Sequence, residues 1–154
     1  MQQGALDGLY QDIILDHYRR PRHRGLLDAP DVEAEGFNPF CGDRVILTAR
    51  LGDDGRIDSV GFAGEGCAIS QASASMMTQL LKGRTLTEAT GLGARFRDLM
   101  KGEELNAEEE EQMGDLAALE GVRKFPVRIK CALLAWSALQ DAIATRIKEQ
   151  EGKS

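Results

Sequence analysis

The sequence predicts an α+β fold in which three short strands come first and helices follow. Residues 31–37, 44–51 and 56–63 are extended segments with alternating apolar and polar residues, and G-D-D-G at 52–55 is a strong turn signal. The chain after residue 66 shows apolar residues at helical spacing instead. This order is typical of a three-stranded antiparallel sheet, with an N-terminal helix and several C-terminal helices packed on one face.

Helices are predicted directly before and directly after the strands. Residues 6–19 carry Leu, Ile and Tyr at helical spacing. Pro21 ends this helix, because proline disfavours helical backbone in the residue before it. A second helix is predicted from residue 67 to Gly83, where a glycine closes it.

Two capped helices are predicted in the second half of the chain. T-x-x-E at 85–88 and N-x-x-E at 106–109 are each typical of a helix start. The first helix is expected to be broken by Gly91 and Gly93 and to run to Met100. The second, which is strongly acidic, is expected to end at about Leu119.

The last helix is predicted to begin at Pro126, where a first-turn proline belongs. Residues 149–154 are expected to form a frayed tail. The sequence shows no internal repeat and no linker, so residues 1–154 are interpreted as one domain. The apolar face of the last helix is expected to hold Val127, Cys131, Leu134, Ala138 and Ala142.

Composition and charge argue against several classes of function. With 42% apolar and 29% charged residues, the 154-residue chain has the balance of a globular protein. No apolar run approaches the roughly 18 residues that span a bilayer, and no secretory signal is present, so a cytoplasmic protein without a membrane partner is expected. The net charge of −6 argues against a nucleic-acid partner. Residues 17–25 form a short basic cluster that is solvated or docks a partner.

The three cysteines can meet at one end of the predicted sheet. Cys41 precedes the second strand and Cys67 follows the third, and in an antiparallel meander these two points lie at the same end. Cys67 also falls at a helix N-terminus, where the dipole favours a thiolate. Cys131, which alone would be interpreted as a small buried apolar residue, can be delivered there by the start of the last helix. Asp43 lies in the same loop as Cys41 and is a natural fourth ligand.

Three thiolates and one carboxylate suit zinc, or iron in a cluster. Arg128 precedes Cys131 by one helical turn and could offset the negative charge of such a site, although a solvated arginine fits equally well. His17 and His23 are expected to be surface residues rather than ligands. Spacing alone does not decide between a zinc site and an iron–sulfur site.

Four segments give the chain a family resemblance. Over nearly its whole length it resembles the U-type iron–sulfur cluster assembly proteins, through LYQDIILDHYRRPRHRG, NPFCGD, GEGCAISQASASMM and FPVRIKCALLAWSAL. The scaffolds of the IscU type carry a histidine where this chain has Lys130. This chain also has an extra segment at about 84–105. In both of these features, and in the tryptophan-bearing segment CALLAW, the chain resembles the SufU-type branch of the family.

The resemblance implies a zinc-dependent sulfurtransferase with a tightly bound Zn²⁺ held by Cys41, Asp43, Cys67 and Cys131. It implies that Cys41 accepts persulfide sulfur from a SufS-type, PLP-dependent cysteine desulfurase, and that the sulfur passes toward a SufBCD-type assembly complex. Arg128 matches a basic residue that helps to position or release Cys41.

Two alternatives remain. One is an IscU-type scaffold that assembles a [2Fe-2S] cluster on the same residues. The other is a purely structural zinc domain. The structural alternative is disfavoured because Cys41 lies on a short loop beside Gly42, a poor choice for a rigid closed site.

Overall fold

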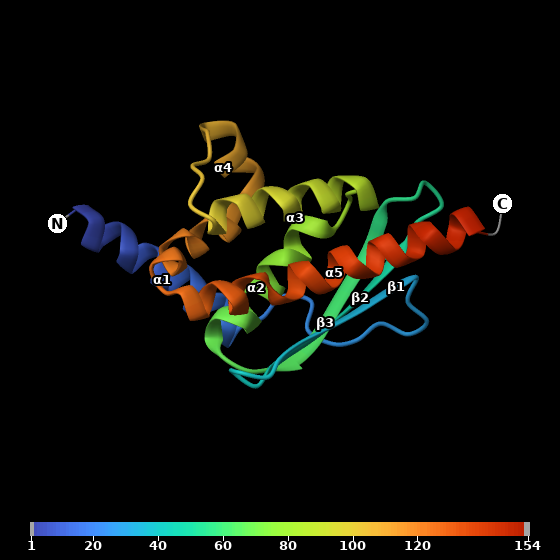
Figure 1. Ribbon diagram of the computed structural model, residues 1–154, viewed down its shortest axis with the longest axis horizontal. Coiled ribbons are helices and arrows are strands. Elements are labelled where there is room, and N and C mark those ends of the chain that lie inside the picture. Colours follow the sequence, from blue (N-terminus) through green and yellow to red (C-terminus); the bar gives the residue numbers. More distant parts are fainter. Residues whose placement is uncertain (1, 153–154) are drawn as a thin grey trace.

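The structure is a computed structural model that describes residues 2–152, and it confirms the α+β class (Figure 1). Three antiparallel strands form one sheet in the order β1-β2-β3, and helices cover one of its faces. The elements are α1 (Gln2–Arg19), β1 (Val32–Asn38), β2 (Asp43–Leu51), β3 (Ile57–Glu65), α2 (Ala68–Leu81), α3 (Leu86–Met100), α4 (Ala107–Met113), the 3₁₀ helix η1 (Gly114–Lys124) and α5 (Pro126–Gly152).

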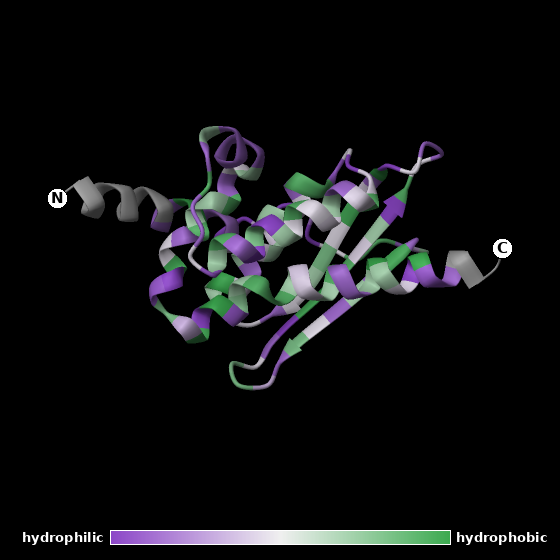
Figure 2. Ribbon diagram, turned by 45° about the horizontal axis from the view of Figure 1, so that its top comes forward, coloured by the Kyte–Doolittle hydropathy of each residue, from purple (hydrophilic) through white to green (hydrophobic). Residues whose placement is uncertain are grey.

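The hydrophobic core lies between the sheet and the helices α2, α3 and α5. Alternate residues of β1 are buried, as expected for a strand with one face on a core. The long helix α5 crosses the sheet (Figures 1 and 2). The Phe96 ring of α3 packs against Trp136 of α5 with 5.8 Å between centroids. The largest fully buried side chains include Leu47, Ile57, Phe62, Met76, Met77, Leu81, Phe96, Leu99, Leu116, Leu119 and Trp136.

The segment between α1 and β1 runs along β3 and then across the outer face of the sheet. Gly25 N donates to Phe62 O at 2.7 Å, and Phe62 N donates to His23 O at 3.0 Å. Further along, Leu27 N donates to Thr48 Oγ1 at 3.0 Å. A side chain at position 61 would collide with the carbonyl of Gly25, so this close approach requires glycine there.

The predicted starts of the helices after the sheet are confirmed, whereas α1 begins at Gln2 rather than at residue 6, and one predicted helix end and two predicted breaks are wrong. Asn106 and Glu109 form a reciprocal capping box at α4. That helix ends at Met113 rather than near Leu119, because Gly114 adopts φ +52 and the chain continues as the 3₁₀ helix η1. The predicted breaks at Gly91 and Gly93 are wrong: α3 is continuous through both.

The apolar face of α5 differs from the prediction by about one residue. The helix begins at Pro126 as expected, but Val127 is 63% exposed. Leu134, Ala138 and Ala142 are only partly buried and lie at the edge of the core. Helix α5 continues to Gly152, through most of the tail expected to fray, and residues 153–154 lie outside the described chain. The buried positions are Cys131, Ala132, Ala135, Trp136, Leu139 and Ile143.

His17 is a buried anchor between three elements, so its expected place at the surface is wrong. Its Nδ1 lies 2.8 Å from Ser75 Oγ of α2, and its Nε2 lies 2.8 Å from Asp115 Oδ2 of η1. Ser75 Oγ also accepts the Arg22 N–H at 2.8 Å. A short polar residue on each neighbouring element satisfies the imidazole, and nothing local in the sequence shows these partners. His23 is exposed, as expected.

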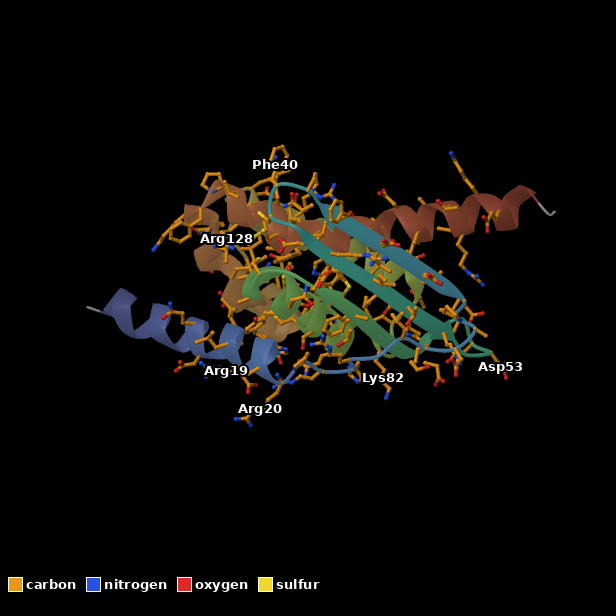
Figure 3. All side chains as sticks on the ribbon, turned by 90° about the horizontal axis from the view of Figure 1, so that it is seen from below. Arg19, Arg20, Phe40, Asp53, Lys82 and Arg128 are labelled. Atoms are coloured by element: carbon orange, nitrogen blue, oxygen red, sulfur yellow. The ribbon has the colours of Figure 1, made fainter. Side chains whose placement is uncertain are left out.

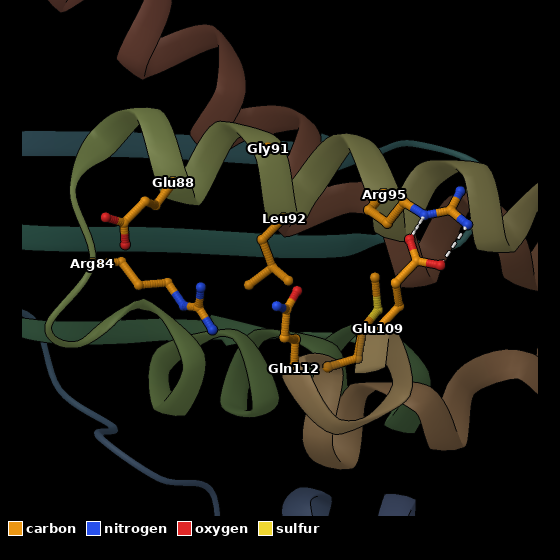
Figure 4. A pocket seen from close by; sticks show the side chains of 8 residues that line it. Arg84, Glu88, Gly91, Leu92, Arg95, Glu109 and Gln112 are labelled. Carbon is orange, nitrogen blue, oxygen red and sulfur yellow. Dashed lines mark hydrogen bonds and ion pairs between the residues drawn. The ribbon is translucent and has the colours of Figure 1, made fainter. Parts of the chain in front are cut away.

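Residues 84–105, which the resemblance marks as an extra segment, form α3 and its connection to α4. A hollow of about 320 Å³ between these helices is lined by Arg84, Glu88, Arg95, Glu109 and Gln112, among others (Figure 4). An ion pair between Arg95 and Glu109 closes one end of it. This pair lowers the pKa of Glu109 and raises that of Arg95. Within the described chain, no helix is both long and apolar enough to span a membrane.

We expect Gly91→Ala to raise the free energy of unfolding by about 0.5–1 kcal/mol, because alanine is the better helix former. A methyl group at Gly91 has no atom within 4 Å, so nothing offsets this gain. Gly93→Ala should raise the free energy of unfolding by less, because its methyl group would lie 3.1 Å from the Trp136 ring and from the Gln140 amide. Urea unfolding of both variants checks the difference. A less stable Gly91→Ala protein would contradict the account of α3.

Candidate metal centre

A tight hairpin loop presents Cys41 at one end of the sheet. Strands β1 and β2 pair up to Asn38 and Asp43, which leaves residues 39–42 as the connection. Phe40 N donates to Asn38 Oδ1 at 3.1 Å, and Gly42 N donates to Asn38 O at 2.8 Å. Gly42 adopts φ +69, a left-handed conformation that glycine accepts without strain. The base of the loop is thereby fixed, while Cys41 lies half-buried near its tip.

Asp43 is a fully buried carboxylate that joins β2 to the start of α2. Its Oδ1 accepts the Cys67 N–H at 2.7 Å, and its Oδ2 lies 3.6 Å from Cys67 Sγ. Gly66 makes this approach possible. It adopts φ +142, and a Cβ atom at this position would overlap Asp43 Oδ1. A buried carboxylate next to thiols is a strong acceptor that a metal ion can satisfy.

Cys67 is the N-cap residue of α2, as its position in the sequence predicted. Its Sγ accepts the Ser70 N–H at 3.5 Å, so the thiol takes the place that serine or aspartate occupies at most helix starts. The side chain is half-buried. The backbone turn at Gly66 therefore directs both the amide and the sulfur of Cys67 toward Asp43.

Cys131 is fully buried and reaches the site from the second turn of α5. Its Sγ lies 3.6 Å from Cys41 Sγ. Burial raises the pKa of the Cys131 thiol, and its hydrogen bonds with Asp43 and Cys41 raise the pKa further. In the absence of a metal ion this thiol holds its proton.

The predicted residues meet at spacings that suit a single metal ion. The ligand atoms of Cys41, Asp43 and Cys131 all lie within 4.8 Å of one another. Cys67 is outside this group of three but adjoins it, with its sulfur 3.6 Å from Asp43. Sulfur ligands at about 2.3 Å from zinc, in tetrahedral geometry, stand about 3.8 Å apart. The 3.6 Å contacts between Cys41 and Cys131, and between Cys67 and Asp43, are close to that spacing.

Arg128 lies beside the thiols, but its strongest partner is Cys67 rather than Cys41. The charge of Cys67 and a hydrogen bond to it raise the pKa of the Arg128 guanidinium, and Cys131 and Cys41 make smaller contributions. The side chain is exposed at the edge of the cluster, near Phe40 (Figure 3). A cation at this position offsets part of the negative charge that three thiolates and a carboxylate would carry.

The sequence did not indicate an apolar groove that opens beside Cys67 and Arg128. The groove has a volume of about 710 Å³ and lies between α1, η1 and α5. Several large apolar side chains around this end of the molecule are exposed, which is typical of a surface that meets another molecule. They are Phe37, Phe40, Phe125 and Val127. Their only sequence signal is their position next to the cysteine segments.

Residues 9–151 match the family described as the NifU-like N terminal domain. The chain is 46% identical over 147 residues to the "zinc-dependent sulfurtransferase SufU" of Bacillus subtilis, covering 96% of this chain and 95% of that protein. It is 44% identical over 144 residues to the "iron-sulfur cluster assembly scaffold protein IscU" of Streptococcus pyogenes, covering 93% of this chain and 87% of that protein.

Solved structures agree with the sequence comparison. A putative iron–sulfur cluster assembly scaffold protein for the SUF system, from Fervidobacterium islandicum, superposes with a TM-score of 0.78 at 33% identity. The superposition covers 86% of this chain and 94% of that one. The chain belongs to the NifU-like N-terminal domain family, which includes the IscU and SufU proteins.

We expect Gly66→Ala to weaken zinc binding by about 10- to 100-fold, the usual effect of disturbing the support of a metal ligand. The added methyl group would push Asp43 away from the Cys67 amide. Gly83→Ala is the matched control, since Gly83 also has a positive φ but has open space around it. Competition with a chromophoric chelator measures both affinities. Equal affinities would show that Asp43 does not depend on Gly66.

We expect the metal-free protein to lose stability as pH rises above about 8.5, the ordinary pKa of a free thiol. The raised pKa of Cys131 means that the folded state keeps this proton, whereas the unfolded chain releases it. The slope for one proton approaches about 1.4 kcal/mol per pH unit. Urea unfolding across this range, with chelator and reductant present, measures it. Cys131→Ala should show a shallower slope, and an unchanged slope would exclude Cys131 as its source.

Proposed function

We propose that this protein is a zinc-dependent sulfur carrier in iron–sulfur cluster assembly, with Cys41 as the residue that accepts sulfur. The observation that carries the proposal is that the four predicted ligands stand on elements of different rigidity. Cys67 caps α2, Cys131 lies inside α5, and Asp43 is buried in β2. Cys41 lies in the four-residue hairpin loop and caps no helix, so it can leave while the other three stay in place.

The donor set fits zinc. Thiolates and carboxylates are zinc ligands, and the ligand atoms of Cys41, Asp43 and Cys131 all lie within 4.8 Å of one another, with Cys67 adjoining them. When bound, zinc supplies a redox-inert charge that keeps the thiols deprotonated near neutral pH. Cys41, Asp43, Cys67 and Cys131 would hold it.

Sulfur transfer is a thiol exchange at Cys41. The Cys41 thiolate attacks the terminal sulfur of a persulfide, R–S–SH, carried by the donor. The new sulfur–sulfur bond forms on Cys41 as the old one breaks, and the donor leaves as the thiolate R–S⁻. The proton stays on the transferred sulfur. Arg128 stabilises the negative charge left at Cys67 while Cys41 is away, which follows from its strongest interaction.

Partners follow from the same role. A SufS-type cysteine desulfurase is the proposed donor, and a SufBCD-type assembly complex is the proposed destination of the sulfur. The exposed apolar residues beside the cysteines and the groove next to Arg128 give such proteins a surface on which to dock. The B. subtilis relative, named a zinc-dependent sulfurtransferase, supports this reading.

A scaffold that assembles a [2Fe-2S] cluster on the same residues is the second candidate. The S. pyogenes relative, named a scaffold at 44% identity, favours it. Against it, the position before Cys131 is Lys130, which offers no metal ligand in its charged form and points toward the Phe40 ring. Metal content separates the two functions.

We expect the purified protein to hold about one zinc per chain, to show no visible cluster absorption, and to stimulate cysteine desulfuration by its cognate desulfurase. In Cys41→Ala the stimulation should vanish while the circular dichroism spectrum is retained. Mass spectrometry should find the added sulfur atom on Cys41 of the unmodified sequence.

Two outcomes would overturn parts of this proposal. Stoichiometric iron and sulfide without stimulation would establish the scaffold function instead. Sulfur acceptance that survives Cys41→Ala would make Cys67 or Cys131 the carrier. Lys82→Met, a surface change at the opposite end of α2 from Cys67, is the control for non-specific effects on the desulfurase (Figure 3).

A further inference from the structure

Phe40 is an aromatic side chain left almost wholly in water. It is 86% exposed, the highest value among the large apolar side chains that the structure describes as exposed. A phenyl ring gains little stability from burial in such a position, so holding it in place would need an interaction other than burial. Lys130 supplies one: its Nζ lies 5.7 Å from the centroid of the Phe40 ring, within the range of a cation–π interaction.

This contact lies directly beside the thiol contact. Phe40 precedes Cys41 on the loop, and Lys130 precedes Cys131 on α5, so the two pairs are neighbours in both segments. Lys130 stands on a helix, which fixes its backbone. Both contacts join the tip of the loop to the same turn of α5, whereas the hydrogen bonds at the base of the loop go to Asn38.

We propose that Phe40 and Lys130 form a latch that holds the loop tip against α5 and sets how often Cys41 leaves the thiol cluster. Both are positioning residues, which act through Cys41. The consequence for sulfur transfer rests on the proposed function of Cys41 as the acceptor.

The strength of such a latch suits a loop that has to open. A solvent-exposed cation–π interaction changes an opening equilibrium by about twofold to fivefold, which is enough to bias the loop and too little to trap it. Because the ring is exposed, a partner that covers Phe40 would compete with Lys130 for it. Docking and release of Cys41 would then be coupled at one residue.

The latch is tested on the metal-free, reduced protein without any desulfurase. Iodoacetamide is added to the folded protein, and peptide mass spectrometry gives the rate of alkylation at Cys41 relative to that at Cys67 in the same molecule. Lys130→Met and Phe40→Leu should each raise this ratio about twofold to fivefold. Lys130→Arg, which keeps the cation, should show the ratio of the unaltered protein. The ratio in the double variant should be no higher than in either single variant, because both substitutions remove the same interaction.

Charge alone predicts the opposite sign for one of these variants. A positive charge near a thiol speeds its alkylation, so the loss of that charge in Lys130→Met would by itself slow the reaction. A faster reaction therefore reports loop opening. A second readout uses the zinc-loaded protein, in which a chelator should remove zinc about twofold to fivefold faster from Lys130→Met, while Lys82→Met should match the unaltered protein.

Three results would overturn the latch. These are an unchanged ratio in both single variants, fully additive effects in the double variant, and an equal rise at Cys67, which would mean general loosening. The result is independent of sulfur transfer. If the ratio rises but Cys41 accepts no sulfur, the latch stands and the proposed function fails.

Discussion

One hydrogen bond, from the Cys67 amide to the buried Asp43 carboxylate, organises the thiol end of this protein. It ties the first residue of β2 to the first turn of α2, two points that the chain reaches 24 residues apart. Asp43 also anchors one side of the loop that carries Cys41, so a single carboxylate places two of the three cysteines. The third approaches on a helix that is already held by the core. Gly66 is the residue that lets this bond form.

The three cysteines are held with unequal rigidity, because different kinds of element carry them. Trp136 and Phe96 pack α5 against α3, and this packing fixes Cys131 a little more than one turn away. Cys67 is held by the helix it caps. Cys41 has only a four-residue loop with a glycine in a left-handed conformation. The stiffness of each ligand therefore follows from the kind of element that carries it.

Much of this could be predicted from the sequence because the signals were local. The alternation of apolar and polar residues, together with the turn residues, predicted the three-stranded meander, and Pro126 predicted the start of α5. The meander in turn predicted that Cys41 and Cys67 lie at one end of the sheet. Helix propensity misled at Gly91 and Gly93, because packing of α3 on α5 outweighs the cost of two glycines.

The features that could not be predicted depend on contacts between residues far apart in the sequence. His17 looks like a surface residue until Ser75 and Asp115 surround it. The face of α5 was misjudged by one position, because Val127 precedes the part of the helix that lies on the core. Arg128 was placed near the right cluster, but only the fold shows that Cys67 is its main partner. Each of these depends on side chains contributed by distant segments.

The segment that runs along β3 has a consequence for how the protein behaves among other chains. An open strand edge offers unpaired amides to any extended peptide and invites aggregation. Here the backbone of His23 and Gly25 occupies both main-chain groups of Phe62, so this edge is partly sealed by the protein itself. The protein thus exposes aromatic rings next to its cysteines and closes part of a strand edge elsewhere, which favours encounters through the end that carries the cysteines.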